Sequence, residues 1–451
     1  MSSPPAPFAL AARASAGIGV EIRELEGRCV VWAEPTGEDR TARLTSESSH
    51  QLARAAATAL AERLPLVVVL STAGAAIDEG VAALHAWGSL AAAMTRCSGI
   101  VPTAVIVDGP AVSGPALLLG LADLTVLTVD SYAFVNGPTT VEEYTGVAMS
   151  VEELGGAPNH ARYTGVATVV VPDRAAAVDT VAELLAFLPD HVDAEPSRIE
   201  TDDPPDRRCP EAGELIPATS TGSYDVRRVA AAIVDADSMV ELRAQWAANV
   251  VTAFATMGGA PVGIVANQPI TLAGTLDIPA SQKAARFVAL CDAFNVPIIT
   301  LVDTPGFYPG KDLEWRGMIR HGAQLVYAYA RATVPRICVI LRKSYGGAYI
   351  VMDSKTMGND LCLAWPWAEL AVMGAGQAAA ILQRRATPEE RAEFERDYTE
   401  RLLNPYVAAE RGLVDAVIDP ADTRREIIAA LDVLADKREL LSGRKHGNSP
   451  L

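Results

Sequence analysis

Short runs of consecutive apolar residues alternate along the chain with longer stretches that show a helical pattern. In the first half, residues 64–74 and 101–107 are such apolar runs, and each leads into a turn of small residues. Continuous apolar runs of this length predict strands that are buried on both faces. Residues 46–63 and 77–96 are expected to be helices, and Thr and Ser residues precede the first of them as possible caps. Strands that alternate with helices of this length predict parallel pairing in an α/β layer fold.

The second half of the chain repeats this arrangement. Residues 296–306 match residues 64–74, with nine positions from the proline to the glycine in both segments. Residues 334–347 match residues 101–114 in the same way, with twelve positions from proline to glycine in both. The two glycine turns are 40 residues apart in the first half and 41 residues apart in the second. A period of this length predicts a duplicated domain and not a solenoid of short repeats.

The duplication predicts two domains, at residues 1–190 and 224–451. A chain of 451 residues also exceeds the usual size of a single hydrophobic core. Between the two domains, residues 191–223 contain many prolines and charged residues, and we expect an extended linker there. Inside the second domain, the pattern predicts a helix over residues 239–250 and a strand over residues 262–267.

A glycine pair at the end of an apolar run is the first candidate for chemistry. Residues 337–341 are predicted to form a buried strand, which continues into a Gly-Gly-Ala turn at 346–348 between Tyr345 and Tyr349. Glycine lets the main chain approach a ligand closely and point its N–H groups outward. Two N–H groups in a dry pocket stabilise an oxyanion or enolate without any side chain. A tight strand-to-helix turn that binds no ligand fits this stretch equally well.

Composition excludes some classes of function. The net charge is −17 and the pI is near 4.9, which argues against nucleic acid and anionic membranes as main partners. No apolar run reaches membrane-spanning length. The six cysteines include no Cys-x-x-Cys pair and the six histidines are not paired at ligand spacing, so we expect neither a disulfide framework nor a metal site. These features predict a cytoplasmic enzyme or enzyme subunit.

Several separated blocks of sequence carry a family resemblance. In order along the second half, these blocks are VGIVANQP at 262–269, DTPGF at 303–307, IRHGA at 319–323, YGGAY at 345–349, AWP at 364–366 and AVMGA at 371–375. In the first half, EELGGA at 152–157 belongs to the same set. Together the blocks resemble the carboxyltransferase (β) subunits of biotin-dependent acyl-CoA carboxylases, of the propionyl-CoA and acetyl-CoA carboxylase type. The resemblance extends from about residue 50 to residue 437.

The resemblance implies a fold, a reaction and partners. The implied fold is two crotonase-like domains, each a β-β-α superhelix, in a homo-oligomer that is a dimer or a trimer of dimers. The first domain would bind acyl-CoA or a related acyl thioester, and the second would bind carboxybiotin carried by a biotin carboxylase or biotin carrier subunit. The implied reaction moves a carboxyl group from carboxybiotin to the α-carbon of the thioester through an enolate. Backbone N–H groups stabilise the charged oxygens, and no metal takes part.

The resemblance also assigns catalytic positions. Gly347 and Ala348 take the place of the N–H pair that stabilises the biotin oxyanion. The repeat puts Gly114 and Pro115 opposite them, at the N–H pair for the thioester enolate. Proline has no N–H, so one of these donors is absent. Loss of one such donor lowers the rate by about 10²–10³ if nothing replaces it.

The candidate substrate-binding residues lie on or next to these two turns, except for Gly74, which lies on the turn after the first apolar run. In the second half they are Tyr345, Tyr349 and Ile350, and in the first half they are Ser113 and Gly74. The two tyrosines either form a wall of the biotin pocket or pack in the core. Propionyl-selective members of the family resemble one another in having Asp at the position of Ile350, so the isoleucine implies a broader or different acyl preference.

Three functions remain open from the sequence. The leading one is a carboxyltransferase subunit with an altered acyl substrate, because the acyl-CoA side is altered at Pro115 while the biotin side is intact. The second is an acyl-thioester decarboxylase or another biotin-independent, enolate-forming enzyme on the same fold. The third is a non-catalytic subunit that assembles with an active paralogue. Arg342 and Lys343 could contact a CoA phosphate, although we expect them to form a solvated strand end.

Overall fold

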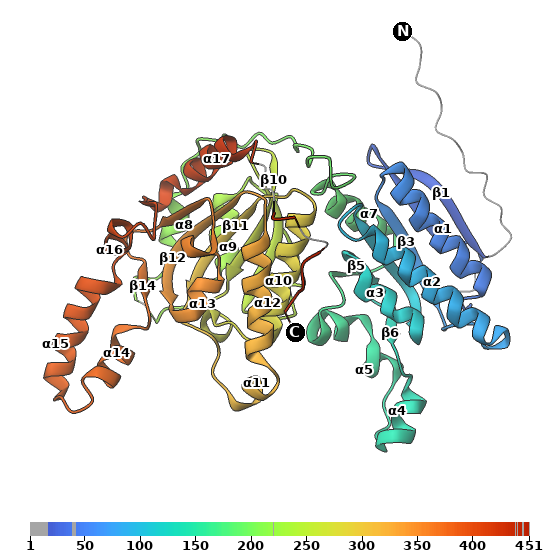
Figure 1. Ribbon diagram of the computed structural model, residues 1–451, viewed down its shortest axis with the longest axis horizontal. Helices are drawn as coiled ribbons and strands as arrows, with labels where there is room; N and C mark the ends of the chain where they lie inside the picture. Colours follow the sequence, from blue (N-terminus) through green and yellow to red (C-terminus); the bar gives the residue numbers. More distant parts are fainter. Residues whose placement is uncertain are drawn as a thin grey trace, which may run out of the picture. The chain divides into compact units, whose positions relative to one another are not determined.

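The computed structural model describes residues 17–37, 42–219, 221–437, 439, 441–443 and 446–450. The chain divides into two compact units, residues 1–196 and 197–451, and each unit is built on its own β-sheet (Figure 1). Among the described residues, no helix is long and apolar enough to cross a membrane.

The first unit contains a seven-stranded sheet with the strand order β1-β2-β3-β4-β5-β7, and β6 pairs with β4. Only β1 and β2 pair in the antiparallel direction among these described strands. The strands are β1 (Ile18–Leu25), β2 (Arg28–Pro35), β3 (Leu66–Thr72), β4 (Thr103–Val112), β5 (Leu124–Thr128), β6 (Tyr132–Phe134) and β7 (Val169–Val171). The helices are α1 (Ser46–Glu62), α2 (Val81–Cys97), α3 (Leu118–Leu121), α4 (Pro138–Thr145), α5 (Val151–Gly155), α6 (Ala157–Asn159) and α7 (Arg174–Ala186).

Helices α1 and α2 lie side by side against the first sheet (Figure 1). Their small and apolar residues, such as Ala56 and Leu90, are buried in one core with Val68 and Val105 of the sheet. The hydroxyl of Thr45 accepts a hydrogen bond from the main chain of α1 at 3.0 Å, which caps that helix as expected. The predicted helices at 46–63 and 77–96 and the predicted buried strands at 64–74 and 101–107 are therefore confirmed, with small shifts at their ends.

The second unit contains an eight-stranded sheet with the order β15-β13-β12-β11-β10-β9-β8, and β14 pairs with β12. The strands are β8 (Val240–Leu242), β9 (Val250–Met257), β10 (Ala260–Asn267), β11 (Ile298–Thr304), β12 (Arg336–Tyr345), β13 (Leu361–Ala364), β14 (Glu369–Ala371) and β15 (Ala416–Val417). The helices are α8 (Pro210–Glu214), α9 (Val226–Ile233), α10 (Ile278–Ala293), α11 (Lys311–Trp315), α12 (Met318–Arg331), α13 (Gly346–Val351), α14 (Ala375–Leu382), α15 (Pro388–Tyr398), α16 (Pro405–Glu410) and α17 (Thr423–Leu434). Helices α10 and α12 pack on each other, while α8, α9 and α17 bury their apolar faces in a core with the central strands.

The two sheets share one topology. In each, an antiparallel pair is followed by parallel strands, and the longest strand, β4 or β12, also pairs with a short extra strand, β6 or β14. The register agrees residue by residue, because Leu66 pairs with Thr103 in the first sheet and Ile298 pairs with Arg336 in the second. Along β4 and β12 the equivalent residues are therefore 233 positions apart, from 103 to 336. The predicted duplication is confirmed by this shared pairing.

Hydrogen bonds around the first glycine of each half are also duplicated. The N–H of Leu44 donates to the carbonyl of Gly74 at 2.7 Å, and the N–H of Leu276 donates to the carbonyl of Gly306 at 3.1 Å. In both halves the glycine N–H donates to a threonine hydroxyl two residues earlier, at 3.2 Å and 3.4 Å. The two turns therefore have the same internal support, although their sequences differ.

The predicted helix over residues 239–250 is wrong. This segment contains β8, a turn and the first residue of β9. The buried Lys283 of α10 donates to main-chain carbonyls of the segment, at 3.0 Å to Arg243, 3.0 Å to Trp246 and 2.7 Å to Val250. These carbonyl groups point toward one ammonium group and therefore cannot accept the hydrogen bonds of a helix. The contact with Lys283 overrides the helical spacing of apolar residues in this segment.

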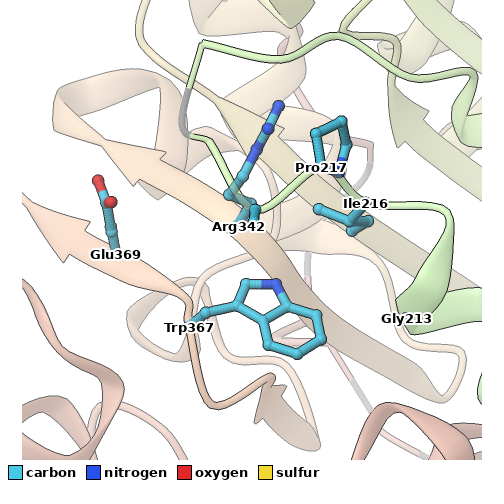
Figure 2. A pocket seen from close by; sticks show the side chains of 7 residues that line it. Gly213, Ile216, Pro217, Arg342, Trp367 and Glu369 are labelled. Atoms are coloured by element: carbon cyan, nitrogen blue, oxygen red, sulfur yellow. The ribbon is translucent and has the colours of Figure 1, made fainter.

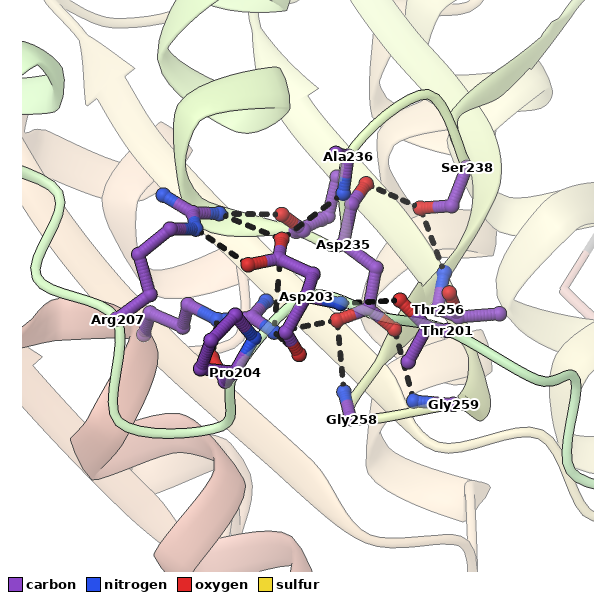
Figure 3. A network of polar contacts seen from close by, with 12 residues as sticks. Thr201, Asp203, Pro204, Arg207, Asp235, Ala236, Ser238, Thr256, Gly258 and Gly259 are labelled. Carbon is purple, nitrogen blue, oxygen red and sulfur yellow. Dashed lines mark hydrogen bonds and ion pairs between the residues drawn. The ribbon is translucent and has the colours of Figure 1, made fainter.

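The segment expected as a linker, residues 191–223, is largely part of the second unit. From residue 197 onward the chain belongs to that unit, and Cys209 and Ala212 are fully buried in its core. Figure 3 shows the polar contacts that fasten the segment: Arg207 forms an ion pair with Asp203 at 2.6 Å, and Asp203 accepts a hydrogen bond from the N–H of Ala236 at 3.0 Å. The positions of the domain boundaries stay a prediction.

Candidate functional site

The Gly-Gly-Ala turn of the second unit joins the end of β12 to the start of α13. Gly346 has φ +60°, and a β-carbon there would lie 3.2 Å from the carbonyl oxygen of Val372, so glycine suits this position. Gly347 is exposed, whereas Ala348 is fully buried. As the first residues of α13, Gly346, Gly347 and Ala348 have N–H groups without an acceptor inside the helix. The turn therefore offers main-chain donors at an exposed, side-chain-free position.

Aromatic rings support this turn. A β-carbon on Gly347 would lie 3.6 Å from the ring of Phe307, which follows the glycine turn at the end of β11. The ring of Tyr345 packs against Gly374, where a β-carbon would lie 3.2 Å away. The Tyr345 hydroxyl donates to the carboxylate of Glu369 in β14. Burial, and then the neighbouring carboxylate, raise the pKa of Tyr345 well above its usual range, so this hydroxyl stays protonated and occupied.

Glu369 also lines a cavity of about 360 Å³ in the second unit, together with Arg342 and Trp367 (Figure 2). Arg342 is only 4% exposed and pairs with Asp303 at 3.0 Å. It also donates to the carbonyls of two residues in the 216–223 segment, at 3.0 and 2.8 Å. The expectation that Arg342 forms a solvated strand end is therefore wrong, because a buried carboxylate and main-chain carbonyls hold its charge.

The corresponding turn of the first unit keeps the main-chain geometry but changes its side chains. Ser113 has φ +64° and ψ −152°, and Gly346 at the equivalent position also has a positive φ, of +60°. This backbone region is almost confined to glycine, and for a residue with a side chain it costs about 1–3 kcal/mol. Gly74 lies against Ser113, since a β-carbon on Gly74 would be 3.3 Å from that of Ser113. The structure thus brings together the predicted residues Gly74, Ser113, Gly114 and Pro115.

Pro115 occupies the position equivalent to Ala348, since 348 minus 233 is 115 in the register of the two sheets. It is buried at the start of a short helical turn, Gly114–Leu117. The next N–H, that of Ala116, donates to the carbonyl of Ser113 at 3.0 Å. Gly114 is therefore the member of the predicted pair that still carries a donor, and Ala116 is already engaged.

The remaining predicted residues lie on α13. Ile350 is 39% exposed and Tyr349 is half-buried, and burial raises the pKa of Tyr349 well above its usual range. Sequence reasoning did not single out Phe307 or Trp87, the rings that pack on the two glycine turns. Their distance from these turns along the chain left no local signal. Among the described residues, no group of three or more His, Cys, Asp or Glu side chains could hold a metal ion.

Comparison with known proteins identifies the class to which this fold and these turns belong. Residues 17–449 match the family model described as the carboxyl transferase domain. The chain belongs to this family of carboxyltransferase enzymes.

Particular relatives match over most of the chain. The propionyl-CoA carboxylase beta chain of Saccharopolyspora erythraea is 46% identical over 406 residues, covering 86% of this chain and 74% of the relative. The methylmalonyl-CoA carboxyltransferase 12S subunit of Propionibacterium freudenreichii subsp. shermanii is 43% identical, covering 87% and 76%. The crystal structure of transcarboxylase 12S, a hexamer with methylmalonyl-coenzyme A bound, matches with a TM-score of 0.93 and 40% identity, covering 96% of this chain and 85% of that one. The predicted fold of two crotonase-like α/β domains is confirmed by this match.

Proposed function

We propose that the chain is the carboxyltransferase subunit of a biotin-dependent acyl-CoA carboxylase. It transfers a carboxyl group from carboxybiotin, carried by a biotin carboxylase or biotin carrier subunit, to the α-carbon of an acyl-CoA. The observation that carries this proposal is the intact β12–α13 turn, with its exposed Gly347 and the N–H groups at its start, in a chain of the carboxyl transferase family. Neither alternative, a biotin-independent enolate-forming enzyme or a non-catalytic subunit, is favoured by these relatives.

The second unit fits the biotin side of the reaction. Carboxybiotin, when bound, would release the carboxyl group as CO2, and the ureido group left behind would take the α-proton before the enolate attacks the CO2. Gly347 leaves room for a planar ring to approach the main chain, because a β-carbon at this position would meet only the Phe307 ring at van der Waals distance. The N–H groups of Gly347 and Ala348 stabilise the negative charge that develops on the ureido oxygen. We assign this side to residues 224–451.

The first unit, within residues 1–190, fits the acyl-CoA side. The bond that forms joins the α-carbon of the thioester to the carboxyl carbon, and the bond that breaks joins this carbon to the ureido nitrogen. Removal of the α-proton places negative charge on the thioester oxygen, and the N–H of Gly114 is the main-chain donor for it. Ser113 and Gly74 complete the surface around this donor. In the second unit, Tyr345 supports the turn, Tyr349 flanks it as a wall of the biotin pocket, and Ile350 on α13 contributes to acyl selection.

Assembly and location follow the same reasoning. The transcarboxylase 12S relative is described as a hexamer, and for this chain we propose a homo-oligomer, either a dimer or a trimer of dimers. All six cysteines are free, and five of them are buried, which is consistent with a cytoplasmic location. The net charge of −17 is unsuited to nucleic acid as a partner.

The test is a transfer assay with the cognate biotin-bearing subunit, ATP and labelled bicarbonate. Acetyl-CoA, propionyl-CoA and butyryl-CoA are offered in parallel. We expect a labelled, carboxylated acyl-CoA with at least one of these substrates. This product should disappear when avidin sequesters the biotin. The absence of biotin-dependent product across the panel would contradict the proposal. Product that persists with avidin would favour a biotin-independent reaction.

A further inference from the structure

The indole ring of Trp87 lies against the glycine of the altered turn. A β-carbon on Gly114 would lie 2.7 Å from Cζ2 of Trp87 and 3.3 Å from its Nε1 atom. The first distance is shorter than any normal carbon contact, so Gly114 is required for the ring to sit there. Trp87 comes from α2, whose neighbouring residues Ala86 and Leu90 are buried in the core and fix the helix that carries the ring.

The Nε1 atom of Trp87 is buried, and within the described part of the chain it has no hydrogen-bond acceptor. The indole N–H is a donor only, so no acceptor role satisfies it. A buried donor that stays unpaired costs about 1–3 kcal/mol. An acceptor that reached this atom when a ligand binds would remove that cost.

The second unit supplies an internal comparison. There, the ring packed on Gly347, the residue equivalent to Gly114, is that of Phe307, which carries no donor. The following residue of that turn is Ala348, which has its N–H. In the first unit the residue after Gly114 is Pro115, which has no N–H. The ring packed on Gly114 is the indole of Trp87. The turn that lacks a main-chain donor is thus the turn whose aromatic neighbour provides one.

We propose that the Nε1–H group of Trp87 replaces the missing N–H of residue 115 and donates to the thioester oxygen of the acyl-CoA. Trp87 is then a catalytic residue, and the first unit binds the developing enolate through one main-chain donor, Gly114, and one side-chain donor. This inference rests on the proposed function and assigns the donor set of its acyl-CoA side.

The first experiment is a mutant cycle in the transfer assay. Trp87→Phe keeps an aromatic ring and removes the donor, and Pro115→Ala restores a main-chain N–H. We expect Trp87→Phe to lower kcat by about 10²–10³ with little change in KM, because the donor acts on charge that develops in the transition state. We expect Pro115→Ala to recover at least about tenfold of this loss in the double variant, since a second donor then returns.

Trp32→Phe is the matched control. Trp32 lies in β2 of the same unit, is fully buried and also has an unpaired Nε1 atom among the described residues. Strand β3 separates β2 from β4, the strand that leads into the Gly114 turn. We expect Trp32→Phe to leave kcat unchanged. Equal kcat values for wild type and Trp87→Phe would overturn the inference while leaving the proposed function intact. A loss that Pro115→Ala does not rescue would assign Trp87 to packing and would also overturn it.

The second experiment does not depend on turnover. The six tryptophans are labelled with ¹⁵N at the indole nitrogen, and their resonances are recorded with propionyl-CoA and with its thioether analogue S-propyl-CoA, which lacks the carbonyl. We expect one indole resonance to move with the thioester and not with the thioether, and to be absent from the spectrum of Trp87→Phe. If no indole resonance distinguishes the two ligands, the inference is wrong.

Discussion

Ala348 and Pro115 occupy the same position in two copies of one turn, and they differ in the N–H that the main chain carries. Both residues are buried, and both lie in the first turn of a short helix. Proline is tolerated in the first turn of a helix because the missing N–H has no partner inside the helix. The first unit demonstrates this tolerance, and the second unit can therefore be tested with the same substitution.

We expect Ala348→Pro to lower kcat for carboxyl transfer by about 10²–10³, because it removes one N–H donor from the turn that we propose to bind biotin. Ala348→Gly, which keeps the N–H, is the control and should retain activity within a few-fold. Steady-state kinetics of both variants with saturating biotin-bearing partner measure the difference. Comparable activity of the proline and glycine variants would show that this N–H does not act on the reaction.

At the scale of residues, the sequence predicts main-chain features better than side-chain partners. The glycine turns and the missing donor at Pro115 are visible in the sequence, because glycine and proline act through their own main chain. Glu369 accepts a hydrogen bond from the Tyr345 hydroxyl, and Trp87 packs on Gly114. Both side chains come from elements other than the turns they contact. Which side chain reaches a given turn depends on helix packing, and a single sequence does not encode that in any local pattern.

At the scale of elements, the contact between α10 and the β8–β9 turn departs most from expectation. Lys283 lies in α10, is 2% exposed and donates to carbonyls of the turn. Two residues of the turn, Arg243 and Ala247, have positive φ values of 54° and 47°. The apolar spacing of residues 239–250 resembles a helix, but the segment also supplies a strand and acceptors for a buried ammonium group. Periodicity alone does not reveal such a long-range partner.

The buried lysine makes stability depend on pH. Burial lowers the pKa of Lys283 from 10.5 to about 7. Between these two values the unfolded chain binds a proton that the folded chain lacks, so the free energy of unfolding rises with pH across this window. Relative to Lys283→Met, we expect wild type to gain up to about 1.4 kcal/mol per pH unit from pH 7 toward pH 10. Urea denaturation at several pH values measures this difference.

Lys311→Met is the control for this measurement, because Lys311 is exposed at the start of α11 and lies over the Trp315 ring. It should follow the wild-type pH dependence. Parallel curves for wild type and Lys283→Met would show instead that the carbonyl groups hold the ammonium form in the folded protein throughout this range.

At the scale of the whole molecule, the segment after residue 196 is fastened to the second unit by buried charge (Figure 3). Arg424 of α17 is fully buried and pairs with Asp235 at 2.5 Å. It also donates to the carbonyl of Pro204 in the segment at 3.2 Å. A proline-rich stretch with this composition predicts an extended linker, but this segment contains the short helix α8, and its charged residues are anchored to buried partners. The charge pattern alone does not distinguish solvated from anchored residues.

We expect Arg424→Met to lower the free energy of unfolding by about 3–5 kcal/mol, because it leaves the Asp235 carboxylate buried without its ion pair. Its neighbour Arg425 is exposed and pairs with Glu426, so Arg425→Met is the matched control and should leave the denaturation midpoint unchanged. Chemical denaturation followed by circular dichroism compares the two variants. Equal midpoints would mean that the segment contributes no stability through this arginine.

The 233-residue correspondence between the two sheets also bears on how such a chain changes during evolution. In a symmetric dimer of a single-copy protein, every substitution in the turn appears twice. It therefore changes the binding of both reactants at once. After the two copies were joined in one polypeptide, each became a separately inherited unit. One half can then carry a proline at this position, as the first unit does at Pro115, while the other keeps the main-chain N–H of Ala348.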